Sequence, residues 1–143
     1  MGKLGIIIFL SLFLSACQVK PRPVDYGTDG CHYCRMTIVD RQHAAQLVTE
    51  KGKAYKFDSV ECMLNYMKDG DEPIALYLVA DYGNPGVLTD ATTATYLISE
   101  NIPSPMGANL SAFGSEDEAG AARDTRGGDL YRWEELLKHF ESK

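Results

Sequence analysis

The stretch A-Y-K-F-D-S-V-E-C-M-L-N-Y-M, residues 54–67, places a strand, a helix cap and an amphipathic helix in direct succession. A-Y-K-F is typical of a strand, and Asp58 or Ser59 is placed to cap the helix that follows. The apolar residues of that helix recur at spacings of three and four: Val60, Met63, Leu64 and Met67. This spacing marks one buried face, so both methionines are assigned to the core.

The rest of the chain predicts further short elements. Strands are expected at 37–40, 44–50, 74–82, 87–89 and 127–133, and helices at 91–99, 116–123 and 134–140. Asp90 is expected to cap the second helix, and Ser115 with Glu118 forms the capping box of the third. A turn, strand, cap and helix recur in 52–67 and 127–140. Two packed β-β-α units would give a small, compact α+β domain.

The N-terminus has the plan of a secretory signal peptide over residues 1–16, with one cation, a short apolar run and small residues before a cysteine. Leu14-Ser15-Ala16-Cys17 resembles the bacterial lipobox, which implies that Cys17 is the lipidated first residue of the mature protein. Gln18 stands where lipoproteins of the inner membrane typically carry Asp, which favours the outer membrane. Residues 17–30 are expected to be a flexible tether, and 31–143 the domain.

The chain is acidic, with a formal net charge of −6. Loss of residues 1–16 removes Lys3, the only charged residue there, and leaves −7. Nucleic-acid-binding proteins need a basic surface to neutralise phosphates. The composition therefore argues against a nucleic acid partner.

Three cysteines remain beside Cys17: Cys31, Cys34 and Cys62. An odd number in an exported protein leaves at least one thiol unpaired, or places several on a metal. A thioredoxin-like couple needs C-x-x-C at the start of a helix, whereas T-I-V-D after the motif favours a strand. A zinc site of the three thiols with His43 or His32 is a second interpretation, but no second closely spaced ligand pair supports it.

Two methionines lie outside the helical faces. Met36 follows Cys34 by two residues, and in an extended segment such side chains share a face. Met106 lies in the loop P-S-P-M-G, where the prolines stiffen the backbone. One thiolate with two thioethers is a soft ligand set that suits Cu(I). We therefore predict a Cu(I) site at Cys34, Met36 and Met106.

Other residues are less certain candidates for the metal. Cys62 falls roughly opposite the apolar stripe and in the first helical turn, where the helix dipole favours a thiolate. It either supports the metal ligands or packs as a small residue, and packing is the preferred interpretation. Cys31 and His32 are further candidates, and His139 is expected on the surface.

The chain resembles the NosL family of lipoprotein copper chaperones, which help to mature the copper sites of nitrous oxide reductase. The matching stretches are the lipobox, C-H-Y-C-R-M-T-I-V-D, A-A-Q-L-V, Y-K-F-D-S-V-E-C-M-L-N-Y-M, V-A-D-Y, D-A-T-T-A and S-P-M-G-A-N-L-S-A-F. The resemblance implies repeated ββα-type units and Cu(I) delivery through Cys34, Met36 and Met106. It also implies two partners in denitrification, a membrane ABC-type transporter complex for copper-site assembly and nitrous oxide reductase.

We therefore expect a non-enzymatic Cu(I) chaperone, lipid-anchored on the periplasmic side of a bacterial membrane. A zinc-stabilised interaction domain and a C-x-x-C thiol–disulfide protein remain as rivals. The sequence contains no P-loop, nucleophile elbow or H-E-x-x-H motif. A monomer and a homodimer are both compatible with it.

Overall fold

The computed structural model describes residues 18–143, so the expected signal peptide and Cys17 lie outside the described residues. In chain order the elements are β1 (Ala45–Thr49), β2 (Ala54–Phe57), α1 (Val60–Asp69), β3 (Ile74–Ala80), β4 (Leu88–Asp90), β5 (Thr95–Ile98), β6 (Leu110–Phe113), α2 (Glu116–Arg126), β7 (Asp129–Tyr131) and α3 (Trp133–Glu141). Among residues 18–143, none of the helices combines the length and apolar character needed to cross a bilayer.

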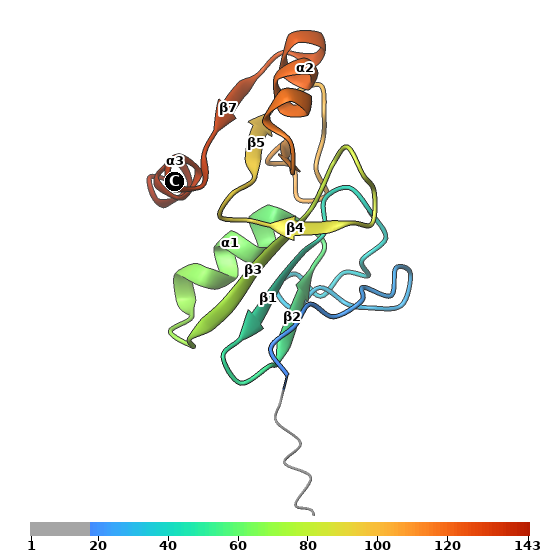
Figure 1. The fold of residues 1–143 in the computed structure, drawn as a ribbon, viewed down its shortest axis with the longest axis vertical. Helices are drawn as coiled ribbons and strands as arrows, with labels where there is room; N and C mark the ends of the chain where they lie inside the picture. Colours follow the sequence, from blue (N-terminus) through green and yellow to red (C-terminus); the bar gives the residue numbers. More distant parts are fainter. Residues whose placement is uncertain (1–17) are drawn as a thin grey trace, which may run out of the picture.

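The strands form two antiparallel sheets, ordered β2-β1-β3-β4 and β6-β5-β7. In each sheet a central strand pairs with the strand that follows it and, after a helix, with a third strand on its other side. The paths β1-β2-α1-β3 and β5-β6-α2-β7 therefore share one topology. Figure 1 shows the first unit in its lower half and the second above it. The expected α+β fold of repeated units is confirmed.

The two units also share the way in which their helices begin. Phe57 ends β2 and Ser59 caps α1, while Phe113 ends β6 and Ser115 caps α2. Each serine hydroxyl accepts a hydrogen bond from the backbone N–H three residues on, at 3.2 Å from Cys62 in α1 and at 3.4 Å in α2. In the structure, the segment β2–α1 is therefore repeated by β6–α2. The recurring pattern in the sequence, residues 52–67 and 127–140, had instead matched β2–α1 with β7–α3.

One hydrophobic core joins the two units. It takes Val60 and Met63 from α1, Tyr96 from β5 and Leu136 from α3, all fully buried. The ring of Trp133 on α3 lies 5.9 Å from Tyr77 of β3 and 6.0 Å from Tyr96, measured between ring centroids. Large buried aromatic rings contribute strongly to core stability. This core fixes the first turn of α1, where the candidate site lies.

Three local predictions differ from the structure. Residues 37–40 form no strand, and only Thr37 makes an isolated bridge, to Gly30. The helix expected at 91–99 is wrong, because the side chain of Asp90 closes a turn with the backbone N–H of Thr92 at 2.8 Å and β5 follows. The β-branched and aromatic residues of T-Y-L-I favour a strand. Strand β6 was not anticipated, because L-S-A-F is short and carries only small side chains at its centre.

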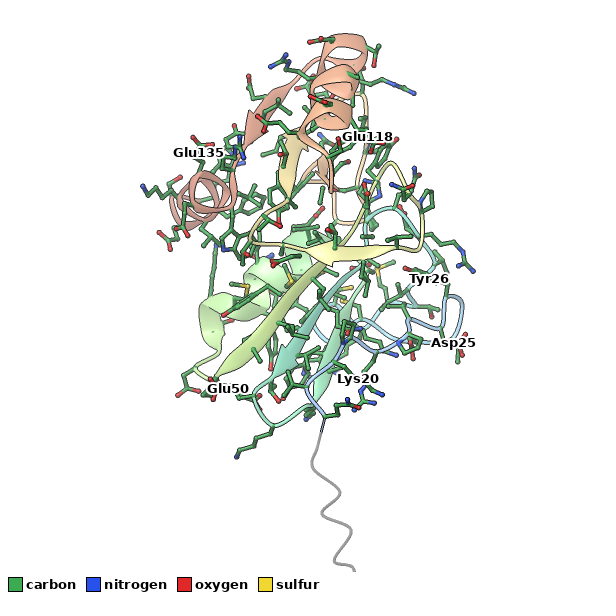
Figure 2. The ribbon with its side chains drawn as sticks, viewed as in Figure 1. Lys20, Asp25, Tyr26, Glu50, Glu118 and Glu135 are labelled. Carbon is green, nitrogen blue, oxygen red and sulfur yellow. The ribbon has the colours of Figure 1, made fainter. Side chains whose placement is uncertain are left out.

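Residues that precede Cys31 also contact the domain. The backbone N–H and C=O of Arg22 exchange hydrogen bonds of 2.8 and 2.9 Å with the buried side chain of Gln46 on β1. The guanidinium of Arg41 lies 4.5 Å above the ring of Tyr26, which Figure 2 labels beside Asp25 at the edge of the molecule. Residues 22–30, expected to be part of the tether, therefore contact the domain.

Candidate functional site

Residues 31–36 form a closed turn and not the extended segment expected from the sequence. The N–H of Cys31 donates to the carbonyl of Met36 at 2.8 Å, and the N–H of Arg35 donates to the carbonyl of Cys31 at 3.0 Å. Arg35 has a φ of 68°, a left-handed conformation that non-glycine residues adopt rarely. The argument that Cys34 and Met36 share the face of a strand is therefore wrong, although both side chains belong to this turn.

The turn brings two cysteines against the junction of β2 and α1. One ligand atom each from Cys31, Cys34, Asp58 and Cys62 lie within 4.8 Å of one another. All three thiols are free. Such a compact group of sulfur and carboxylate atoms has the size and chemistry of a site for a single thiophilic ion. We call these four residues the thiol cluster.

The sulfur of Cys31 accepts hydrogen bonds on several sides. The Cys62 thiol donates to it and is the main reason that the pKa of Cys31 falls to about 5, with backbone N–H groups adding to the effect against burial. One of these, the N–H of Cys34, lies 3.5 Å from the sulfur. The same contact, together with burial, raises the pKa of Cys62. The proton of the pair therefore stays on Cys62, against the expectation that the helix dipole makes Cys62 the thiolate.

Cys34 is the accessible member of the thiol cluster. Its side chain is partly exposed, whereas Cys31 is 1% exposed and Cys62 is fully buried. Its sulfur lies 3.5 Å from Oδ2 of Asp58. Burial, together with the neighbouring Cys31 and Asp58, raises the pKa of Cys34, against a backbone hydrogen bond from Met36 that lowers it. The raised pKa of Cys34 favours the protonated thiol.

Asp58 was one of the two residues expected as candidates for the cap of α1. The structure assigns the cap of α1 to Ser59 and turns the buried Asp58 side chain toward the cysteines. Among residues 18–143, its second oxygen, Oδ1, has no hydrogen-bond partner. Buried carboxylate oxygens are normally paired. This orphaned atom, next to three thiols, is compatible with a site that receives a cation.

The structure buries, fully or in part, the two methionines that the sequence assigned to the core and exposes the other two. Met63 is fully buried and Met67 packs against the core. Met36 is 58% exposed and Met106, in the loop between β5 and β6, is 43% exposed. Apolar thioethers exposed to this extent are free for contacts that the fold itself does not use.

The histidines are engaged elsewhere. The His32 ring lies against Tyr55 at 4.5 Å and against Tyr66 at 5.2 Å, measured between ring centroids. Both ring nitrogens of buried His43 are hydrogen-bonded, Nδ1 with Asp40 at 2.8 Å and Nε2 with Ser111 at 3.0 Å. The histidine expected to complete a zinc site is therefore replaced in the thiol cluster by Asp58.

The fold and the site define a small α+β protein with a buried, soft thiol cluster that opens to solvent at Cys34. The NosL family model matches residues 24–140. A Copper-binding lipoprotein NosL from Stutzerimonas stutzeri is 30% identical over 147 residues, covering 92% of this chain and 77% of that protein. This chain belongs to the NosL family.

A solved structure supports the fold. The crystal structure of the copper chaperone NosL from Shewanella denitrificans superimposes with a TM-score of 0.72 at 22% identity. The similarity covers 82% of this chain and 96% of that one. The arrangement of two repeated units is therefore shared with a member of the family.

The exposure of the thiols predicts their reactivity. Iodoacetamide should alkylate Cys34 in the native, reduced chain, and Cys31 and Cys62 only after unfolding in urea, because modification requires access as well as a thiolate. Since the pKa of Cys34 is raised, its rate should still be rising above pH 8.5, about the ordinary thiol pKa. Mass spectrometry of peptides over a time course measures both effects. Equal native labelling of the three cysteines would contradict the closed thiol cluster.

Proposed function

We propose that this chain is a non-enzymatic, membrane-anchored Cu(I) chaperone. The observation that carries the proposal is the thiol cluster, in which one accessible thiol stands over two buried ones. Three of its four donors are soft sulfur atoms, and soft donors select Cu(I) over hard cations. The names of the relatives, a copper-binding lipoprotein and a copper chaperone, support the same function.

In this proposal Cys34 supplies most of the affinity, as a thiolate, and the exposed thioethers of Met36 and Met106 supply selectivity and lability. Both methionines are exposed, so a partner's ligands can reach a copper ion held between them. A carrier needs such access, because it passes the metal on by exchanging one ligand at a time. This proposal assigns no ligand role to Cys31, Cys62 or His32. The buried pair Cys31 and Cys62 forms the base of the site beneath Cys34.

The destination of the copper is proposed from the resemblance of the sequence to the NosL family. The chaperone would deliver Cu(I) for assembly of the copper sites of nitrous oxide reductase, together with an ABC-type transporter complex in the membrane. It would act on the periplasmic side as a monomer or a homodimer, attached to the outer membrane through the lipid on Cys17.

Replacement of Cys17 by serine tests the anchor. The variant should move from the membrane fraction to the soluble periplasmic fraction, because stable anchoring depends on the acyl chains and the acidic domain offers no basic surface for anionic lipids. Fractionation followed by immunodetection measures the shift. Retention of the variant in the membrane would show that another segment anchors the chain.

A zinc-binding domain is the second candidate, because the three thiols and Asp58 also satisfy the number of ligands that structural zinc requires. It predicts that chelation unfolds the domain, since structural zinc supplies folding free energy. A thiol–disulfide enzyme is less favoured, because C-H-Y-C lies in a turn and its first cysteine is buried.

Competition titration of the reduced chain with Cu(I), without oxygen, separates these functions. We expect about one Cu(I) per chain, bound more tightly than Zn(II). Cys34→Ser should weaken Cu(I) binding more than about 100-fold, beyond the 10–100-fold typical of residues that only support metal ligands. Met106→Leu should weaken it about tenfold, roughly 1.4 kcal/mol. Met67→Leu, a change at a partly buried core position, is the matched control and should leave affinity unchanged.

Tight Zn(II) binding with indifferent Cu(I) binding would contradict the chaperone and favour the zinc domain. An unchanged Cu(I) affinity in Met106→Leu would exclude that thioether from the site.

A further inference from the structure

Glu61, in the first turn of α1, points into the protein although most glutamates of surface helices face water. Its side chain is 3% exposed. Its Oε1 accepts hydrogen bonds from the hydroxyl of Ser104 and from the backbone N–H of Ala108, the latter at 3.3 Å. An acidic side chain is rarely buried without hydrogen-bond partners; in Glu61 both contacts fall on Oε1, and Oε2 has none among residues 18–143. Glu61 therefore joins α1 to the loop that precedes β6.

The two partners of Glu61 bracket Met106. Ser104 lies two residues before this methionine and Ala108 two residues after it, so one carboxyl group holds both sides of the P-M-G turn. Within the loop, the N–H of Gly107 donates to the carbonyl of Ser104 at 3.0 Å. The Ser104 hydroxyl also accepts from the N–H of Leu110 at 3.3 Å. The loop is thus fastened to α1 and to the start of β6.

The same helical turn carries the thiol cluster. Cys62 follows Glu61 directly, and its sulfur lies in contact range of those of Cys31 and Cys34. Because the Met106 side chain is 43% exposed, packing against the core does little to fix it. Its position relative to Cys34 depends on where its loop is attached, and Glu61 makes that attachment.

We propose that Glu61 is a positioning residue for copper binding. It touches no metal; it holds the Met106 thioether at the mouth of the thiol cluster so that this thioether and the Cys34 thiolate bind one Cu(I). This inference rests on the proposed function, in which Met106 is a ligand. Because Glu61 already orders the loop in the copper-free protein, less conformational entropy is lost when copper binds, and the Cu(I) affinity is higher.

The test is a double-mutant cycle on the full chain purified in detergent, measured by competition for Cu(I) without oxygen. Glu61→Met keeps the length of the side chain and removes the acceptor oxygens. It should weaken Cu(I) binding about tenfold, like Met106→Leu. The double variant should be no weaker than either single variant, because a ligand that is absent cannot be positioned. Glu61→Gln keeps an acceptor oxygen and should restore most of the affinity.

A second readout separates positioning from stability. Cu(I) should shift the methyl NMR resonance of Met106 in the wild-type chain and shift it less in Glu61→Met. Asp81→Asn is the matched control, since buried Asp81 holds a different loop through the N–H of Gly83 at 3.1 Å and the side chain of Asn84 at 2.9 Å. It should leave the Cu(I) affinity and the Met106 shift unchanged. Ser104→Ala removes one of the two donors and replaces Glu61→Met if the latter does not fold.

Wild-type affinity in Glu61→Met, or losses from Glu61→Met and Met106→Leu that add in the double variant, would overturn the inference while leaving the chaperone intact. The proposed function itself would fail if the wild-type chain did not bind Cu(I), or if Met106→Leu bound it unchanged. Either result would also rule out the role proposed for Glu61.

Discussion

The contact between the sulfur of Cys31 and the junction of β2 and α1 is the constraint on which the site depends. The turn 31–36 has little secondary structure of its own, beyond its closing hydrogen bonds and a bridge from Gly30 to Thr37. The Cys62 thiol and backbone N–H groups converge on the Cys31 sulfur. A buried sulfur with this many donors is held firmly, because loss of any one contact leaves an unpaired polar group away from water. Cys31 thereby sets the position of Cys34.

This anchoring divides the sulfur atoms into two groups with different tasks. Cys31 and Cys62 are buried and hydrogen-bonded to each other, so they shape the floor of the site. Cys34 and the two methionines are the sulfur residues that solvent reaches. In the proposed function the buried pair supplies rigidity and the exposed group supplies exchange. A fully buried set of thiolates would bind copper more tightly but release it slowly.

Much of the fold could be predicted from the sequence, because strong local signals coincide with burial. The stripe beginning at Val60 and the serine at 59 determined α1, and Trp133 and Leu136 determined the face of α3. The prediction failed where polar, β-branched residues followed a good cap, as at Asp90, since a turn and a helix begin with the same side-chain hydrogen bond. Strand β6 was missed because its pairing with β5 is a tertiary effect.

In the candidate site, too, local patterns could be predicted from the sequence and tertiary contacts could not. The spacing of Cys34 and Met36 and the loop position of Met106 predicted a soft-metal site, but the thiol cluster depends on tertiary contacts that no spacing reveals. Asp58 was a candidate helix cap, and nothing in the sequence marks Glu61 as a buried residue. Both are instead buried, one against the thiols and the other against the Met106 loop. A polar residue next to a cap is ambiguous in sequence, because two or three neighbouring positions offer the same acceptor.

X-ray absorption at the copper edge, recorded on the chain loaded with one equivalent of Cu(I), tests the central claim most directly. We expect a coordination shell of sulfur alone, and loss of one short sulfur contact in Cys34→Ser. A shell that contains nitrogen or oxygen, supplied by His32 or Asp58, or one that Cys34→Ser leaves unchanged, would contradict a Cu(I) site built on Cys34.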